Sequence, residues 1–208
     1  QTTKIISCVD KKDKNCPIGE RTQTGSGAKI LLVKGQNTVL TAGHVCDTQP
    51  TEKIELFVQT IAVRDSLNRI HQAWPINVTF HDPVKGTGDL CLLWVPTLEG
   101  YPGAKISKIA PKIGEEIYYI GAPMGIFHPP TVPIFRGTFS GKLDESSSII
   151  TAPATGGSSG GPIFNSNHEI VGVLFAANRE FHHVSLIVNF EILNSFLLNS
   201  KKIINAHL

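Results

Sequence analysis

The chain has 208 residues, of which 41% are hydrophobic and 17% are charged, and its formal net charge at pH 7 is +2. A chain of this length can bury a substantial core, either as one domain or as two small barrels packed together. The near-neutral charge gives no indication of nucleic-acid binding, and no apolar run approaches the roughly 18–20 residues that a membrane-spanning helix needs.

Short apolar or alternating runs recur between turns rich in Gly, Pro, Asn and Asp, a rhythm typical of an all-β barrel or sandwich. The helical pattern is weak until residues 190–198, which predict a short amphipathic C-terminal helix packed on the second half of the chain. The apolar runs lie at residues 28–34, 38–42, 53–63, 90–95, 116–121, 148–152 and 169–176.

Two candidate site residues lie at the ends of such runs. His44 follows the run at 38–42, and histidine is the side chain best suited to accept and return a proton near neutral pH. Asp89 precedes the run at 90–95, where a carboxylate is costly unless it is paired, and a histidine N–H is a suitable partner. The alternatives are a structural histidine, which we favour for the other seven, and a turn aspartate that caps a strand.

The middle of the chain contains two segments rich in Gly and Pro. Residues 96–111 predict the connection between two halves, with a boundary near residue 106. The first half, 1–106, then carries His44 and Asp89. Residues 121–130 predict a surface loop.

A third candidate site is the run Thr-Gly-Gly-Ser-Ser-Gly-Gly-Pro at residues 155–162. Glycine lets the backbone adopt positive φ and turn its N–H groups inward. A nucleophilic serine needs such a loop, because its Oγ must be exposed while nearby N–H groups face the oxygen that becomes negative. The alternative is a surface turn rich in Gly and Ser.

The three sites together carry a family resemblance. Thr41-Ala42-Gly43-His44, Gly88-Asp89-Leu90 and the run from Gly157 to Pro162 follow one of the chain orders of a Ser-His-Asp triad. The chain resembles the chymotrypsin-like (trypsin-fold) serine proteases, and more specifically the HtrA/Deg-type trypsin-like peptidases, over residues 22–197. Gly25-Ser26-Gly27 matches the segment that leads into their first barrel.

The resemblance implies an all-β fold of two antiparallel six-stranded β-barrels with a short C-terminal helix, the second barrel formed by 107–208. Too few residues follow residue 197 for a PDZ domain, so we expect the protease domain only. The chain starts at Gln1 rather than at methionine, as after removal of a leader or after trimming.

The resemblance also assigns roles. Ser159 is the nucleophile, His44 the general base, and Asp89 the group that orients the imidazole, while the N–H groups of Gly157 and Ser159 form the oxyanion hole. The implied activity is hydrolysis of peptide bonds in peptide or protein substrates, through an acyl-enzyme and with no metal or organic cofactor. The alternatives are a non-catalytic binding protein on the same fold and an esterase or acyltransferase.

Ser158 departs from the digestive trypsin-like enzymes. These enzymes carry an aspartate at this position, which pairs with a newly cut N-terminus, and serine cannot make that ion pair. We therefore expect activity that does not depend on a free amine at Gln1.

Specificity is predicted by the same resemblance. Residues 151–154 and 174–177 line the primary pocket, and the latter pair with substrate backbone by β-addition. No acidic group lies in 151–154, which predicts a small or medium apolar side chain before the cut; His182 and His183 leave a preference for Glu or Gln as the alternative. The expected substrate-binding residues are Ala154, Leu174, Phe175, Ala176 and Ala177.

The four cysteines predict two disulfides. Cys46 and Cys91 each lie two residues after a proposed triad member, so they approach if His44 and Asp89 meet. Cys8 and Cys16 are close in sequence and can close a small loop, which predicts the second pair among three possible pairings. Such bridges favour a secreted or periplasmic protein. The alternative is four unpaired buried thiols in a cytosolic protein.

Overall fold

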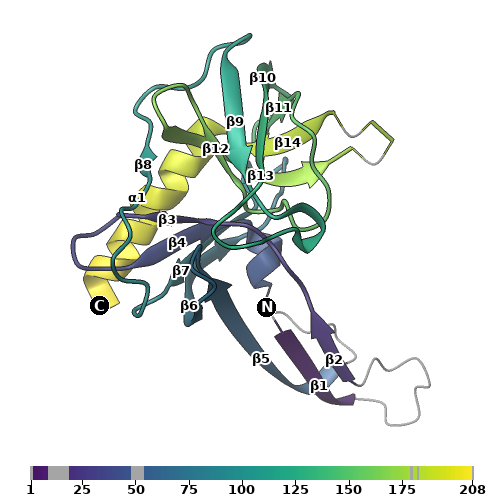
Figure 1. Cartoon of the computed structure of the whole chain (residues 1–208), viewed down its shortest axis with the longest axis vertical. Coiled ribbons are helices and arrows are strands. Elements are labelled where there is room, and N and C mark those ends of the chain that lie inside the picture. Colours follow the sequence, from purple (N-terminus) through teal and green to yellow (C-terminus); the bar gives the residue numbers. More distant parts are fainter. Residues whose placement is uncertain (1, 9–18, 48–53, 179, 182, 208) are drawn as a thin grey trace.

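The computed structural model describes residues 2–8, 19–47, 54–178, 180–181 and 183–207. Within these residues the strands form two sheets, one from each half of the chain, and a C-terminal helix lies beside both (Figure 1). No helix in these ranges is long and apolar enough to cross a membrane.

The first sheet has the strand order β2-β1-β5-β6-β7-β4-β3 and is antiparallel throughout. Strands β4 and β7 are buried almost completely because both of their faces pack against apolar side chains. By contrast, β6 alternates at its start, with His71 and Ala73 buried and their neighbours exposed. The strands are β1 (Thr2–Cys8), β2 (Gly19–Thr22), β3 (Ala28–Ile30), β4 (Thr38–Thr41), β5 (Ile54–Arg64), β6 (Ile70–Thr79) and β7 (Leu90–Trp94).

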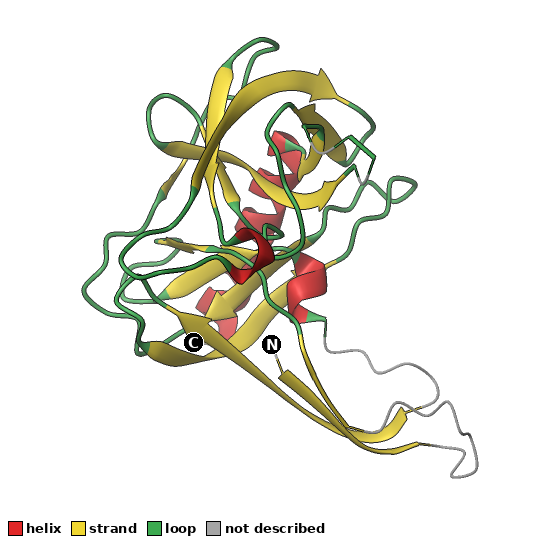
Figure 2. Cartoon of the chain, turned by 45° about the vertical axis from the view of Figure 1, so that its right-hand side comes forward, coloured by secondary structure: helices red, strands yellow, loops and turns green. Residues whose placement is uncertain are grey.

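This first sheet is open in the part of the chain that the structure describes, so the expected closed first barrel is not confirmed. The outer edge of β3 is occupied by Ala104, whose N–H donates to the carbonyl of Lys29 at 2.8 Å. Strand β5 does not return to β3. It pairs with β1, and with β2 these strands form a three-stranded arm that projects from the molecule (Figures 1 and 2).

The second sheet has the order β12-β9-β10-β11-β14-β13-β8, and a further pairing between β12 and β13 closes six of these strands into a barrel. This confirms one of the two predicted barrels. Strand β8 lies outside the ring and pairs with β13 in parallel. The strands are β8 (Lys105–Ile106), β9 (Glu116–Ile120), β10 (Ile134–Lys142), β11 (Ser147–Ile150), β12 (Pro162–Phe164), β13 (Glu169–Ala177) and β14 (Ser185–Val188).

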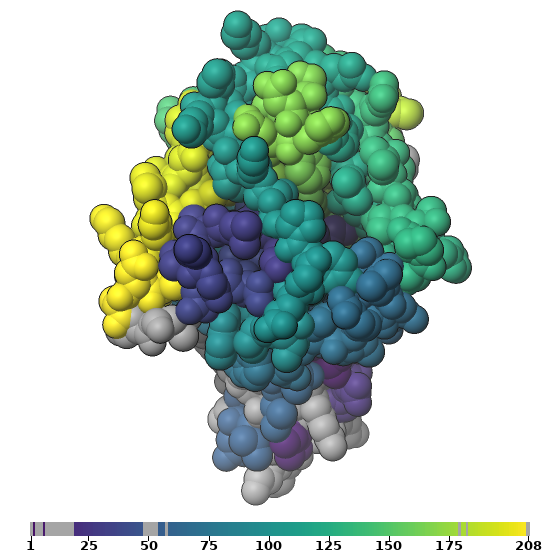
Figure 3. Space-filling model, turned by 60° about the vertical axis from the view of Figure 1, so that its left-hand side comes forward, coloured from purple at the N-terminus to yellow at the C-terminus, as the bar shows by residue number. Residues whose placement is uncertain are grey.

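The helix α1 (Phe190–His207) is longer than predicted and packs on both sheets rather than on the second alone. Its buried residues share one apolar cluster with Leu90 and Leu92 of β7 and with Val173 and Val188 of the barrel. Figure 3 shows the helix, in yellow, beside the dark-blue residues around β3 and β4. Each such buried side chain stabilises the fold by about 1.5–3 kcal/mol. The buried helix residues are Leu193, Phe196, Leu197 and Ile204.

Candidate active site

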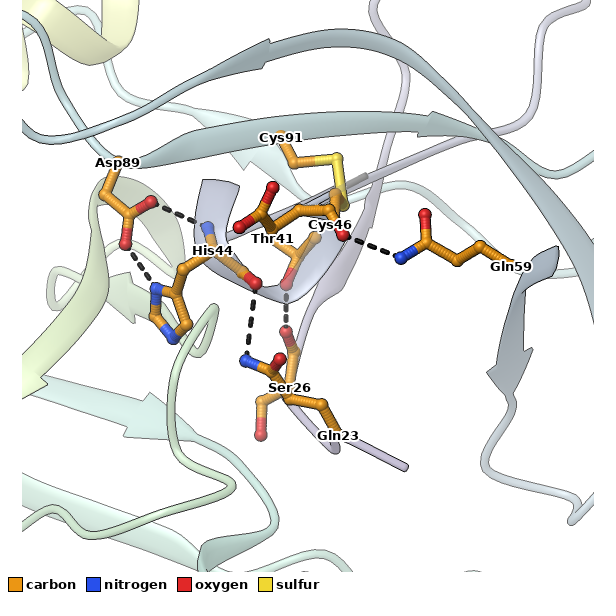
Figure 4. The surroundings of a disulfide bond; sticks show 9 residues. Gln23, Ser26, Thr41, His44, Cys46, Gln59, Asp89 and Cys91 are labelled. Atoms are coloured by element: carbon orange, nitrogen blue, oxygen red, sulfur yellow. Dashed lines mark hydrogen bonds and ion pairs between the residues drawn. A yellow bond between two sulfur atoms is a disulfide. The ribbon is translucent and has the colours of Figure 1, made fainter. Parts of the chain in front are cut away.

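His44 lies in a short 3-10 turn, Gly43–Cys46, directly after β4. Asp89, which is 4% exposed, precedes β7 and holds this turn at two points. One carboxylate oxygen accepts the backbone N–H of His44 at 2.8 Å, and the other bonds to the ring Nδ1 (Figure 4). Because Nδ1 is bound, the ring turns Nε2 away from the carboxylate, and 37% of the His44 side chain is exposed. The imidazole can therefore exchange a proton with a bound molecule.

A disulfide joins Cys46 to Cys91, with a Cα–Cα distance of 6.3 Å (Figure 4). Both cysteines are fully buried. The bridge ties the turn that carries His44 to the strand that follows Asp89, and a bridge that closes such a loop stabilises a fold by about 2–4 kcal/mol. The second predicted bridge, between Cys8 and Cys16, stays a prediction because Cys16 lies outside the described residues.

The run at residues 155–162, called the serine loop below, packs on the segment that precedes His44. The N–H of Ser26 donates to the carbonyl of Ser159 at 2.7 Å, and the hydroxyl of Thr41 donates to the carbonyl of Ser26 at 2.6 Å. Gly160 has φ +87°, and a Cβ there would lie 2.1 Å from both Ser26 O and Thr41 Oγ1. Only glycine permits this approach, which places Ser159 beside the strand end that leads to His44.

The two serines of the loop lie in different surroundings. Ser158 is fully buried, and its Oγ accepts the N–H of Thr155 at 3.3 Å and lies 3.4 Å from the hydroxyl of Tyr119. Ser159 is partly exposed. None of the hydrogen bonds among the described residues joins the Ser159 hydroxyl to the His44 ring; such bonds are often long without substrate and tighten in the complex.

Tyr119 lies beneath the serine loop and is fully buried. Its hydroxyl donates to the carbonyl of Pro153 at 2.5 Å, in the segment expected to line the primary pocket. Burial raises the pKa of Tyr119, so the hydroxyl stays protonated and remains a donor. Sequence reasoning missed this residue, because a tyrosine in an apolar strand carries no signal beyond that of a core residue.

The N–H groups of Gly157 and Ser159 are expected to form an oxyanion hole. Neither Gly157 N–H nor Ser159 N–H donates to a protein acceptor within the described part of the chain. The carbonyl of Gly156 accepts the N–H of Met124 at 2.7 Å. Since a trans peptide directs its C=O and N–H to opposite sides, this bond points the N–H of Gly157 away from Met124.

Gly157 itself requires glycine. Its φ is +89°, and a Cβ there would lie 2.5 Å from the carbonyl oxygen of Ala122. A larger residue would be strained in this left-handed conformation and would also clash with the neighbouring loop.

The expected substrate-binding segment lies at the end of β13. Leu174 exchanges two backbone hydrogen bonds with the serine loop, from Gly160 N–H at 2.7 Å and to Gly161 O at 3.0 Å. Beyond it, Ala176 and Ala177 pair with β14 on one side, and no described strand pairs with their other side. An open strand edge of this kind can pair with an extended peptide.

The side chains around this edge are mostly apolar. Ala154 and Leu174 are buried, and Ala177 packs against the same cluster inside the barrel. The ring of Phe175 lies 4.9 Å from that of His81, at the side of the first sheet. His183 is exposed and packs edge-on against Phe181 at 5.8 Å, whereas His182 lies outside the described residues.

Comparison with known proteins decides the family. The model of the trypsin-like peptidase domain matches residues 25–173. The chain belongs to this family. Its membership confirms the predicted class of protein, a trypsin-like serine peptidase domain. No curated protein matches the chain.

Solved trypsin-like structures are similar over nearly the whole chain. A serine endoprotease from Yersinia pestis is 18% identical to this chain, with a TM-score of 0.68. The match covers 97% of this chain but only 62% of the Yersinia chain. The Rv3671c protease from M. tuberculosis, in its active form, is 18% identical with a TM-score of 0.63, over 95% of this chain and 78% of its own. An inactive serine-to-alanine mutant of Rv3671c is 19% identical with a TM-score of 0.60, over 97% of this chain and 86% of its own. At these identities the likeness shows a shared fold.

Proposed function

We propose that the protein is a serine endopeptidase whose nucleophile is Ser159, whose general base is His44 and whose orienting carboxylate is Asp89. The observation that carries this proposal is the pair of hydrogen bonds that the Asp89 carboxylate accepts from His44, one from its backbone N–H and one from its ring. The serine loop packs beside them. A carboxylate in this position fixes the tautomer that presents Nε2 to a hydroxyl and stabilises the imidazolium that forms.

The reaction follows from these positions. Ser159 Oγ attacks the peptide carbonyl while its proton passes to His44 Nε2, and the resulting oxyanion accepts hydrogen bonds from the N–H groups of Gly157 and Ser159. The C–N bond breaks as His44 returns the proton to the leaving amine, which leaves an acyl-enzyme. Water, deprotonated by His44, then hydrolyses the ester and restores the serine.

The contacts of Ser158 support activity without N-terminal processing. Its hydroxyl is held by Thr155 N–H and lies next to Tyr119, so the serine loop has internal partners where digestive relatives need an ion pair with a new N-terminus. Residues added before Gln1 should therefore leave activity unchanged. A chain that stayed inert until trimmed would contradict this part of the proposal.

The proposed preference is for small or medium apolar side chains before the scissile bond. Ala154 and Leu174 belong to the barrel's apolar cluster, and Ala177 packs against it. The exposed position of His183 against Phe181 gives no support to a Glu or Gln preference. A peptide-library profile rich in Ala, Val or Leu is expected, and one dominated by Glu, Gln, Arg or Lys would reject this preference.

Two coarser features complete the proposal. The Cys46–Cys91 bridge supports an extracytoplasmic location, since disulfides persist in oxidising compartments. The chain passes from the first sheet to the second between Ala104, which bonds to β3, and Lys105 of β8, which supports a domain boundary near residue 106.

The test compares the wild type with Ser159→Ala and Ser158→Ala in casein cleavage and fluorophosphonate labelling. We expect both signals to disappear in Ser159→Ala and to persist in Ser158→Ala, because the Ser158 hydroxyl is buried. Loss of both signals in Ser158→Ala alone would show that the nucleophile is Ser158 and would contradict the assignment to Ser159. A wild type that neither cleaves nor labels would indicate a binding protein on a protease fold.

A further inference from the structure

Ser26 joins three segments of the proposed active site through four hydrogen bonds. Its N–H donates to Ser159 O at 2.7 Å, and its carbonyl accepts the hydroxyl of Thr41 at 2.6 Å. Its hydroxyl donates to Gly157 O at 2.7 Å and accepts the N–H of Ala122 at 2.9 Å. One residue of the first half thus contacts both ends of the Gly157–Ser159 segment and the loop that follows β9.

The hydroxyl of Ser26 holds the peptide on one side of Gly157 directly. The carbonyl of this peptide, Gly157 O, bonds to Ser26, and its N–H, on Ser158, donates to the carbonyl of Thr155 at 3.0 Å. Both polar groups of the peptide are therefore engaged, and it cannot rotate without losing both bonds.

The same hydroxyl holds the other peptide of Gly157, the one it shares with Gly156, indirectly through the turn at residues 122–125. By binding the N–H of Ala122, Ser26 anchors the turn that Gly125 N–H closes onto Ala122 O at 3.0 Å. Met124 lies inside this turn with a left-handed φ of +54°, and its N–H holds Gly156 O at 2.7 Å.

We propose that Ser26 is a positioning residue that keeps the Gly157 N–H directed toward the developing oxyanion. The inference rests on the proposed function. Gly156 and Gly157 have no Cβ, so their shared peptide can rotate at little intrinsic cost unless neighbours restrain it. A rotated peptide would present the Gly156 carbonyl where the N–H belongs, and an oxyanion hole that lacks one donor loses about 10²–10³ in rate.

A purely structural role for Ser26 is the competing explanation, and Thr38 supplies a matched control. The hydroxyl of Thr38 donates to the carbonyl of Ile30 at 2.9 Å within the first sheet, and none of the hydrogen bonds among the described residues joins Thr38 to the serine loop. Thr38→Val removes a hydroxyl-to-carbonyl bond from the same half of the molecule. It should lower the melting temperature without reaching the proposed oxyanion hole.

The experiment measures kcat, KM and the inhibition constant of a peptide boronate for the wild type, Ser26→Ala and Thr38→Val. The boronate forms an anionic tetrahedral adduct with the nucleophile and places one of its oxygens in the oxyanion hole, so its affinity reports transition-state binding. In Ser26→Ala we expect kcat to fall by about tenfold or more, boronate affinity to fall in proportion, and KM to stay unchanged. In Thr38→Val all three should match the wild type.

The outcomes separate this inference from the proposed function. Wild-type kcat and boronate affinity in Ser26→Ala, or a loss equal to that of Thr38→Val, would overturn the role of Ser26 while leaving the protease intact. A wild type that neither cleaves nor labels would overturn the proposed function itself, and the role of Ser26 with it. If Ser26→Ala melts below the assay temperature, Ser26→Cys replaces the hydroxyl with a larger group that is a weaker donor, and it should also show a loss of kcat.

Discussion

The histidine turn and the serine loop belong to one proposed site but are held in place by different kinds of contact. His44 is fixed by the carboxylate of Asp89 and by a covalent bridge two residues further on. The serine loop is fixed mainly by backbone hydrogen bonds and by close approaches that only glycine allows, at Gly157 and Gly160.

This contrast predicts which substitutions should impair each region. The histidine turn should be sensitive to changes of charge and covalent linkage, because side chains hold it. The serine loop should be sensitive to single added atoms at Gly157 and Gly160, because the neighbours of these two residues leave no room for a Cβ. Four variants test this difference, in order of decreasing expected effect.

Asp89→Asn should have the largest effect. The amide keeps the volume of the carboxylate but favours the wrong imidazole tautomer and removes the charge that stabilises the imidazolium. We expect kcat to fall by about 10⁴-fold with little change in fold. Steady-state kinetics together with circular dichroism would check this, and near-normal activity would remove Asp89 from the proposed triad.

Gly157→Ala should lower kcat by about 10²–10³-fold, since the added Cβ would displace the N–H that we propose as an oxyanion donor. Gly35→Ala is the matched control, because Gly35 has a similar φ of +83° with nothing within 4 Å of the added Cβ. The control should carry the same backbone strain and retain full activity. Equal losses in the two variants would indicate strain alone and contradict a local role of Gly157.

Replacing both cysteines, as Cys46→Ser with Cys91→Ser, should act mainly on stability. The loss of about 2–4 kcal/mol corresponds to a fall in melting temperature of roughly 5–15 °C for a chain of this size. Below that temperature kcat should change little, because Asp89 still holds His44 through two hydrogen bonds. Calorimetry and kinetics on the same sample would separate the two effects, and a large loss of kcat at full folding would show that the bridge positions His44.

Tyr119→Phe should have the smallest effect. The ring remains in the core, but the carbonyl of Pro153 loses its donor, which costs about 1 kcal/mol of folding free energy. We expect a modest rise in KM for apolar substrates with kcat within a fewfold of the wild type. A fall in kcat much larger than a fewfold would instead show that the serine loop depends on the Tyr119 hydroxyl beneath it.

The sequence predicted the parts of the site that lie at the ends of apolar runs. His44 and Asp89 adjoin strands whose burial is visible in the residue pattern, and the serine loop is marked by its glycines. The role of Ser26 could not be predicted from the pattern alone, because its hydroxyl bonds to a residue 131 positions away. Its motif, Gly25-Ser26-Gly27, marked the segment but not the contact.

The open first sheet and the full length of the helix could not be predicted from the sequence either, for other reasons. The open first sheet depends on which strand occupies the edge of β3, and Ala104 does so from the connecting segment, where no strand pattern exists. The helix continues past residue 198 through polar residues, one of which, Ser200, is buried. Its hydroxyl can be buried because it donates to Phe196 O and accepts a hydrogen bond from the side-chain amide of Asn77. The apolar periodicity alone therefore ended the helix too early.

The helix α1 also has a thermodynamic consequence. Its apolar residues share one cluster with both sheets, so neither sheet can expose its side of that cluster while the other stays intact. The two halves should therefore melt as a single cooperative unit, with one calorimetric transition and equal van't Hoff and calorimetric enthalpies. Although the proposed nucleophile and the proposed base come from separate sheets, heating should inactivate both at the same temperature.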